Sequence, residues 1–198
     1  MTHTELFENY TSKDVLRKKY KAVRNSLSAD TRAVLSGEIC RRICALGEIQ
    51  SAGAVMNYAA LRSEVDTDAV SEYVLSHKKT LLLPVTDVNT QTMHASEADF
   101  VHMERGGYGI AEPCDKTEFC ANGIDAVIVP ALVYNRNGFR IGYGKGYYDK
   151  FFAQCRNVLK IGAAYSVQIC SEAFEAAHDI PVDIIVTENE VIYCGKTR

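Results

Sequence analysis

The chain has 198 residues, of which 47% are hydrophobic and 24% are charged, and its formal net charge is −3. This length and apolar content suit one domain with a packed core. The small negative charge excludes a general attraction for nucleic acid or for an anionic membrane, so any anion site has to be built locally. No stretch reaches the roughly 18 apolar residues of a membrane span, and residues 1–10 contain no apolar signal segment. We therefore expect a cytoplasmic protein with neither a nucleic-acid nor a membrane partner.

Seven cysteines are scattered along the chain, without any C-x-x-C pair. Cys40 and Cys44 are spaced by one helical turn, but no histidine pair accompanies them, which argues against a metal site. Free, buried thiols in a reducing compartment are the favoured interpretation.

The first half of the chain alternates between helical and extended patterns. Ser12 is a good N-cap for a helix that continues to about Ser26. A second helix is expected from about residue 29 to 46, followed by Gly47. The apolar face of this second helix is predicted to consist of Val34, Leu35, Ile39, Ile43 and Leu46.

The middle of the chain predicts buried strands at 52–58 and 80–84, and a weaker one at 91–95. Between the first two, a helix is expected to start at Thr67. Its apolar positions are Val70, Val74 and Leu75.

The second half begins with a strongly apolar strand at 125–129, which Pro130 ends. A helix from Tyr147 to about Cys155 follows, with Tyr148, Phe151, Phe152 and Cys155 at helical spacing. Further predictions are a strand at 158–164, a helix at 168–177, and strands at 182–187 and 191–194. Apolar strands alternating with helices predict an α/β fold with a mostly parallel central sheet. Ligands collect at the carboxyl ends of such strands, where the segment after Pro130 lies.

The segment from Arg140 to Asp149 reads RIGYGKGYYD and is the most informative part of the chain. Its glycines alternate with Tyr143 and Lys145, so backbone N–H groups can approach a ligand closely. A glycine-rich segment that leads into a helix directs amide donors and the positive end of the helix dipole at one point. Arg140 and Lys145 add two positive charges, and Asp149 in the first turn can hold a metal cation. These features predict a site for a magnesium-bound nucleotide phosphate.

Two common glycine motifs do not fit this segment. The dinucleotide fingerprint G-x-G-x-x-G fails because Tyr147 takes the place of its third glycine, and Walker A fails because no Ser or Thr follows the lysine. A flexible glycine turn with solvated charges therefore stays an alternative.

The glycine-rich segment resembles the most specific motif of the 5-formyltetrahydrofolate cyclo-ligase family, also called 5,10-methenyltetrahydrofolate synthetases. The resemblance extends over nearly the whole chain. The matching pieces are Lys13 to Arg17 with Arg24 and Leu27-Ser28, Glu64 to Thr67, Leu83-Pro84, Gly107 to Pro113, Val129-Pro130, Gly138 to Asp149, His178-Asp179, Val182-Asp183 and Thr187-Glu188. Asn135-Arg136-Asn137 stands where the family often has an Asp, and Lys145 replaces a glycine of many members.

The resemblance implies a layered α/β domain of the NagB/RpiA type that spans residues 1–198, with residues 1–10 as a flexible extension. It implies ATP-dependent closure of 5-formyltetrahydrofolate to 5,10-methenyltetrahydrofolate, with release of ADP and phosphate and with Mg²⁺ as cofactor. The expected partners are these two small molecules, and the expected oligomeric state is a monomer or a weak dimer.

The resemblance also assigns residues to roles. The implied ATP-binding residues are Lys13, Arg17, Arg140, Ile141, Gly142, Tyr143, Gly144, Lys145, Gly146, Tyr147 and Tyr148. The implied folate-binding residues are Ala59, Glu64, Tyr108, Tyr143, Gly144, Lys145, Gly146 and Tyr147. Of these, Lys13, Arg140 and Lys145 are implied to be catalytic. Asp149 and Asp179 are implied to hold the magnesium ion.

Each assignment has a simpler alternative. Lys13 and Arg17 lie at i and i+4, so they point the same way from one helix face, but neighbouring lysines would also make this a solvated basic face. Asp149 would suit a helix dipole, and Glu64 a helix start near Thr67. At the level of the whole protein, a catalytically idle folate or nucleotide sensor and a different ATP-using transferase stay open. Lys13, Arg140 and Asp149 favour catalysis over the sensor.

Overall fold

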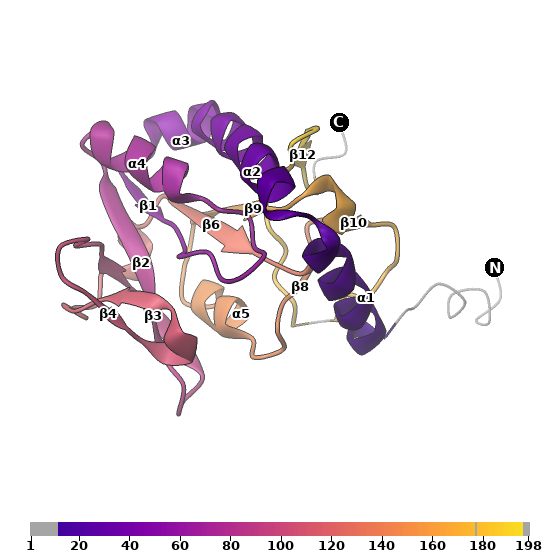
Figure 1. The fold of residues 1–198 in the computed structure, drawn as a ribbon. Helices are drawn as coiled ribbons and strands as arrows, with labels where there is room; N and C mark the ends of the chain where they lie inside the picture. Colours follow the sequence, from indigo (N-terminus) through magenta and orange to yellow (C-terminus); the bar gives the residue numbers. More distant parts are fainter. Residues whose placement is uncertain (1–11, 177, 196–198) are drawn as a thin grey trace.

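In the described part of the chain, seven strands form the central sheet in the spatial order β12-β11-β9-β6-β1-β2-β3 (Figure 1). The computed structural model describes residues 12–176 and 178–195. The inner strands from β2 to β11 run parallel, whereas the edge strands β3 and β12 are antiparallel to their neighbours. The strands are β1 (Ala54–Met56), β2 (Thr80–Asp87), β3 (Thr92–Glu97), β6 (Ala126–Pro130), β9 (Leu159–Ala163), β11 (Ile184–Val186) and β12 (Val191–Tyr193).

Helices cover both faces of this sheet, because its central strands are apolar on both sides. In β6, Ala126 and Ile128 pack with one group of helices, and Val127 and Val129 pack on the opposite face. The first face is covered by α2 (Ala29–Cys44), α3 (Gly47–Ser51) and α4 (Asp68–Ser76), and the second by α5 (Tyr147–Phe152). Figure 1 shows the two layers on either side of the sheet. The described residues form a single α/β domain.

Two smaller sheets lie beside the central one. Helix α1 (Lys13–Ser26) packs through Leu16 and Tyr20 on a separate apolar cluster at the three-stranded sheet. That sheet has the order β10-β7-β8, and the second small sheet pairs β4 with β5. Their strands are β7 (Val133–Asn135), β8 (Arg140–Ile141), β10 (Ile169–Cys170), β4 (Met103–Arg105) and β5 (Ala111–Pro113). Short 3-10 turns lie at Gly107–Gly109, Ala121–Gly123 and Ser166–Gln168.

The order of the parallel strands reverses between β1 and β6. Numbered along the chain, the parallel strands follow the spatial order 2-1-3-4-5. The chain leaves β1 toward β2 on one side and leaves β6 toward β9 on the other. Segments that follow such neighbouring strands diverge, and the space beyond their carboxyl ends is where ligands bind in open α/β sheets. The segment after β1 contains Glu64, and the segment after β6 leads to the glycines.

Most predicted elements are confirmed, with ends shifted by a few residues. Helix α1 begins after Ser12, whose hydroxyl accepts a hydrogen bond from the Asp14 amide. The mostly parallel α/β sheet is confirmed as well. Residues 1–10, expected to form an extension, lie outside the described residues.

Other details of the prediction are wrong. In the described residues 168–176 no α-helix forms. A 3-10 turn ends at Gln168, whose side chain accepts a hydrogen bond from the Tyr165 amide, and the chain continues into β10. Val34 and Leu75 are exposed rather than buried, and Gly47 opens α3 instead of only ending α2. The helix that begins at Tyr147 stops at Phe152.

The cysteines are all free, as expected, but not all are buried. Cys114 and Cys120 are exposed, whereas burial raises the pKa of Cys40 to about 12. In residues 12–176 and 178–195, no helix is long and apolar enough to cross a membrane.

A pair of glycine substitutions tests this packing. A Cβ added at Gly162 in β9 would lie 2.7 Å from the ring of the fully buried Tyr134, so Gly162→Ala should lower the free energy of unfolding by about 1–3 kcal/mol. Gly37 lies in α2 with open space around it, so Gly37→Ala should raise that free energy by about 0.5–1 kcal/mol. Urea unfolding of both variants checks the signs, and a neutral Gly162→Ala would contradict the packing of β9 on Tyr134.

Candidate functional site

The glycine-rich loop, residues 142–146, connects β8 to the first turn of α5. Gly144 and Gly146 have φ angles of 92° and 69°, a backbone region that residues with a Cβ rarely adopt. Gly146 is the N-cap of α5, and residues 143–146 are exposed. Tyr147 and Tyr148 are half-buried, and Ile141 in front of the loop is buried in the cluster below α1. The expected loop-to-helix geometry is therefore present.

Helix α1 contacts this loop through Arg17, which is separated from Gly142 by 125 positions in the sequence. The Arg17 side chain donates a hydrogen bond from Nε to the Gly142 carbonyl at 3.0 Å. Its guanidinium also lies close to Gly144, since a Cβ built there would be 3.4 Å from the guanidinium nitrogen. Arg17 pairs in addition with Asp14 of its own helix. The structure thus brings α1 and the glycine-rich loop together, as the resemblance implies.

Lys13, one turn before Arg17, forms an ion pair with Asp179 at 2.5 Å. The same carboxylate oxygen of Asp179 accepts a hydrogen bond from the Ala176 amide at 2.8 Å. Partial burial opposes ionisation of Asp179, but the hydrogen bonds from Lys13 and Ala176 outweigh it, and the pKa of Asp179 is lowered. Asp179 is therefore an ionised carboxylate at neutral pH.

Arg140, expected to add positive charge to the loop, is paired with a carboxylate and largely enclosed. Its side chain is only 6% exposed and donates to the Asp149 carboxylate at 2.9 Å and to the Ile180 carbonyl at 2.6 Å. The guanidinium also lies over the rings of Tyr148 and Phe152, at 5.8 and 5.4 Å from their centroids. The Arg140 side chain can be enclosed because Asp149, nine residues later, supplies its counter-charge. Lys145 is the exposed cation of the loop.

The Asp149 carboxylate is hydrogen-bonded to the backbone directly after Asp179. Asp149 Oδ1 accepts a hydrogen bond from the Ile180 amide at 3.2 Å, and Ile180 directly follows Asp179. The hydrogen bonds of the described residues use Oδ1 of Asp149 and Oδ2 of Asp179, and one oxygen of each carboxylate has no hydrogen bond. Oxygen donors of this type suit Mg²⁺, which usually takes one or two protein carboxylates and completes its shell with phosphates and water. No cluster of three or more His, Cys, Asp or Glu ligands occurs among the residues described.

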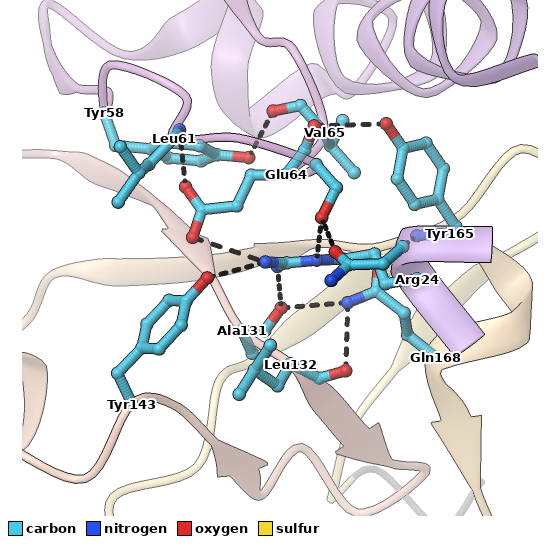
Figure 2. A network of polar contacts seen from close by, with 12 residues as sticks. Arg24, Tyr58, Leu61, Glu64, Val65, Ala131, Leu132, Tyr143, Tyr165 and Gln168 are labelled. Carbon is cyan, nitrogen blue, oxygen red and sulfur yellow. Dashed lines mark hydrogen bonds and ion pairs between the residues drawn. The ribbon is translucent and has the colours of Figure 1, made fainter. Parts of the chain in front are cut away.

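Glu64 lies in the segment that follows β1 (Figure 2). It is 9% exposed. Its Oε2 accepts a hydrogen bond from the Leu61 amide at 2.9 Å, and its Oε1 lies 3.8 Å from the guanidinium of Arg24. Burial raises the pKa of Glu64, although the Leu61 amide and the Arg24 charge act in the opposite direction. Ala59 is half-buried in the same segment.

Tyr108 stands at a positive φ of 59° between two glycines and is 54% exposed. Its hydroxyl lies 3.1 Å from that of Tyr147, and the two rings meet edge to face at 6.2 Å. The structure therefore joins the Tyr108 turn to the first residue of α5, directly after the glycine-rich loop.

The Tyr108 turn rests on two residues that the sequence analysis missed. Glu112 is 1% exposed and accepts hydrogen bonds from the Thr86 amide and hydroxyl through Oε1. Its Oε2 has no hydrogen-bond partner in the described structure. A Cβ at Gly106 or Gly107 would collide with Glu112 or Thr86, so both glycines are needed for this close contact.

Arg24 is a third residue whose role was not predicted. Lys13, Arg17, Tyr20 and Arg24 are spaced by four, three and four residues, so they share one face of α1. That spacing is visible in the sequence and extends the basic face already noted at Lys13 and Arg17. Burial of the Arg24 charge is not visible there, because its partners come from other parts of the chain.

Comparisons with known proteins identify the family of this chain. The model of the 5-formyltetrahydrofolate cyclo-ligase family matches residues 9–188. The chain belongs to this family. The 5-formyltetrahydrofolate cyclo-ligase of Mus musculus is 22% identical, with 90% of this chain and 95% of the mouse protein covered. The enzyme of Mycoplasma pneumoniae is 26% identical, with 89% and 98% covered.

Solved structures of the family have the same fold. The 5,10-methenyltetrahydrofolate synthetase of Aquifex aeolicus is 32% identical and superposes with a TM-score of 0.83 over 94% of both chains. The Mycoplasma pneumoniae synthetase superposes with a TM-score of 0.75 at 24% identity and supports the fold. The chain is thus a 5-formyltetrahydrofolate cyclo-ligase, a ligase of folate one-carbon metabolism.

The buried Glu64 predicts a particular dependence of stability on pH. A carboxyl group whose pKa is raised on folding contributes stability below its ordinary pKa of about 4.3, and this stability is lost as pH rises through the raised value. Glutamine does not titrate, so the free energy of unfolding of Glu64→Gln should improve relative to wild type as pH rises from 4 to 7. Urea unfolding at both pH values measures this difference. Glu118 is exposed, so Glu118→Gln is the matched control substitution at the surface. A constant difference for Glu64→Gln would contradict the effect of burial.

Proposed function

We propose that ATP binds between helix α1 and the glycine-rich loop, and that 5-formyltetrahydrofolate binds between Glu64 and Tyr108. The observation that carries this proposal is the meeting of α1 with the loop: Arg17 bonds to Gly142, and Lys13 bonds to Asp179 beside the start of α5. The triphosphate needs positive charge and free amide donors together. Arg17, Lys13, Lys145 and the loop backbone supply both.

The folate site is supported by chemistry of a different kind. Glu64 offers a carboxylate in a mostly buried position, and a carboxylate can accept paired hydrogen bonds from the amino-pyrimidine edge of a pterin. Tyr108 offers an exposed ring for stacking on a flat ligand. Both residues are connected to the region of the glycine-rich loop. Glu64 lies near Arg24, which donates a hydrogen bond to the Tyr143 hydroxyl. The Tyr108 hydroxyl lies within hydrogen-bond distance of that of Tyr147.

The proposed reaction has two steps. The formyl oxygen of 5-formyltetrahydrofolate attacks the γ-phosphorus of ATP, and ADP leaves. Nitrogen 10 of the folate then attacks the phosphorylated formyl carbon, loses its proton, and phosphate leaves to give 5,10-methenyltetrahydrofolate. Such chemistry depends on alignment and on neutralising phosphate charge rather than on a protein nucleophile. Lys13, Arg140 and Lys145 are the proposed sources of that charge.

Asp149 and Asp179 are the proposed holders of Mg²⁺, since within residues 12–176 and 178–195 each carboxylate has one oxygen that accepts no hydrogen bond. When bound, Mg²⁺ supplies positive charge that neutralises the phosphate oxygens. Both carboxylates are now paired with cations, Asp149 with Arg140 and Asp179 with Lys13. These cations are therefore held beside the carboxylates and near the proposed phosphate position.

The activity and its metal requirement are tested together. Purified protein with ATP and 5-formyltetrahydrofolate should form the methenyl chromophore, lose activity with a chelator, and regain it with added Mg²⁺. Asp149→Asn removes an anionic ligand, so it should raise the Mg²⁺ concentration for half-maximal rate by about tenfold or more. Calorimetric titration with 5-formyltetrahydrofolate should give wild-type affinity for this variant. An unchanged Mg²⁺ titration would remove Asp149 from the metal site, whereas absence of turnover in the wild type would contradict the reaction itself.

The glycine-rich loop has its own test. Gly144→Val places a β-branched residue at a φ of 92° and directs it toward the Arg17 guanidinium, so it should reduce ATP affinity by about tenfold or more. The loop is exposed, so the free energy of unfolding should change far less than the affinity. Calorimetric titration with ATP measures the effect, and thermal unfolding is the control. A folded Gly144→Val protein that binds ATP like wild type would show that the loop does not hold the phosphates.

A further inference from the structure

Arg24 is a charged residue enclosed by the protein: it is 1% exposed, at the last turn of α1. A buried guanidinium is costly unless its donors are satisfied and its charge is balanced. Its Nε donates to the Ser63 hydroxyl at 3.1 Å, and one terminal nitrogen donates to the Ala131 carbonyl at 3.1 Å. The other terminal nitrogen donates to the Tyr143 hydroxyl at 2.7 Å. Figure 2 shows the contacts of the guanidinium with Ala131 and Tyr143, which approach it from different segments.

These three segments belong to different parts of the site. Ser63 precedes Glu64 in the segment after β1, and Ala131 follows β6 directly. Tyr143 belongs to the glycine-rich loop. Arg24 therefore bridges the two strands at which the sheet order reverses, and it connects both with the loop that follows.

The contact with Tyr143 is important because the loop itself is exposed. Tyr143 is 44% exposed, and its hydroxyl bond with Arg24 is part-buried. Arg17 holds the beginning of the same loop through Gly142. Two arginines on one face of α1 thus hold two successive residues of the loop.

The contact with Glu64 is electrostatic. The Arg24 nitrogen that bonds to Ala131 lies 3.8 Å from Glu64 Oε1, too far for a hydrogen bond, while Glu64 Oε2 is held by the Leu61 amide. Both charges are buried, so their attraction is screened less than at the surface. The position of the guanidinium therefore affects the position of the carboxylate.

We propose that Arg24 is a positioning residue that couples the two ligand sites, because it holds the Tyr143 hydroxyl, and with it the glycine-rich loop, in a fixed relation to the Glu64 carboxylate. This inference rests on the proposed roles of Glu64 in folate binding and of the loop in nucleotide binding. A ligand that orders the loop fixes the guanidinium, and this lowers the entropic cost of ordering Glu64 for the second ligand. By thermodynamic linkage, the effect has the same magnitude in both directions.

The test compares folate binding in the absence and presence of nucleotide. 5-Formyltetrahydrofolate is titrated calorimetrically into the protein alone and into protein saturated with a non-hydrolysable magnesium-ATP analogue. The ratio of the two dissociation constants is the coupling factor. We expect about fivefold or more tighter folate binding with the analogue in the wild type. Tyr143→Phe removes only the hydroxyl, and Arg24→Lys retains the charge but loses the planar fork, so each should bring the factor close to one.

The double variant should behave like either single variant, because both substitutions break the same contact. Gln168→Leu is the control. Gln168 is buried and shares the Ala131 carbonyl with Arg24, but in the described structure its side chain forms no hydrogen bond with Tyr143 or Glu64. This variant should be less stable in urea, with the wild-type coupling factor. A purely structural role of Arg24 predicts instead that Gln168→Leu and Arg24→Lys change coupling alike.

The outcomes separate this inference from the proposed function. A wild-type coupling factor of one, or a Tyr143→Phe variant with the wild-type factor, would overturn the role of Arg24 while leaving the reaction intact. Tyr143→Phe decides the question even where Arg24→Lys fails to fold, because its change is confined to an exposed side chain. Failure of the wild type to bind 5-formyltetrahydrofolate at all would overturn the proposed site instead.

Discussion

Strands β1 and β6 are hydrogen-bonded neighbours, yet the chain leaves their carboxyl ends in opposite directions, and the site depends on this divergence. The segment after β1 turns toward β2 and contains the buried Glu64. The segment after β6 passes through β7 and β8 and becomes the glycine-rich loop. Two segments that are far apart in sequence therefore face one another beyond the same edge of the sheet, as in other open α/β sheets.

Helix α1 adds positive charge to that of Arg140 and Lys145 at this edge of the sheet. Its apolar residues pack on the small sheet β10-β7-β8, and this places its basic face over the glycine-rich loop. Removing one partner of a buried ion pair typically costs about 3–5 kcal/mol, so the contact between Arg24 and Glu64 constrains how α1 can be placed. The charges of the site are thus arranged by the same packing that holds the helix on the domain.

Local patterns made much of the fold and of the site predictable. The apolar run before Pro130 identified a central strand, and glycine alternation identified the loop that leads into α5. Patterns of this kind depend on near neighbours. The prediction of a helix at 168–177 is wrong in its described part, because the Gln168 side chain forms hydrogen bonds with the backbone of Tyr165, Ala131 and Leu132. The amino-acid type alone does not reveal such long-range bonds.

The pairing of charges is the part that the sequence conceals. Lys13, Arg140, Asp149 and Asp179 were all recognised as candidates, but their pairing into two ion pairs follows from tertiary structure. Arg24 and Glu64 are separated by 40 residues in the sequence, and their proximity likewise depends on the packing of α1. The residues around Glu112 in the sequence do not indicate that its side chain is buried beneath the Tyr108 turn. Only the fold shows this position.

The attachment of α1 has a consequence for how the domain opens. This helix packs mainly on the small cluster around Tyr20 and Phe174, whereas β6 is buried between helices on both faces. Segments with less buried apolar surface exchange their amide hydrogens through local opening, at a lower free energy than global unfolding. The amides of α1 therefore belong to a less protected cooperative unit than those of β6. Thermal melting reports global unfolding of the whole sheet. It is consequently a poor measure of how often the basic face of α1 separates from the glycine-rich loop.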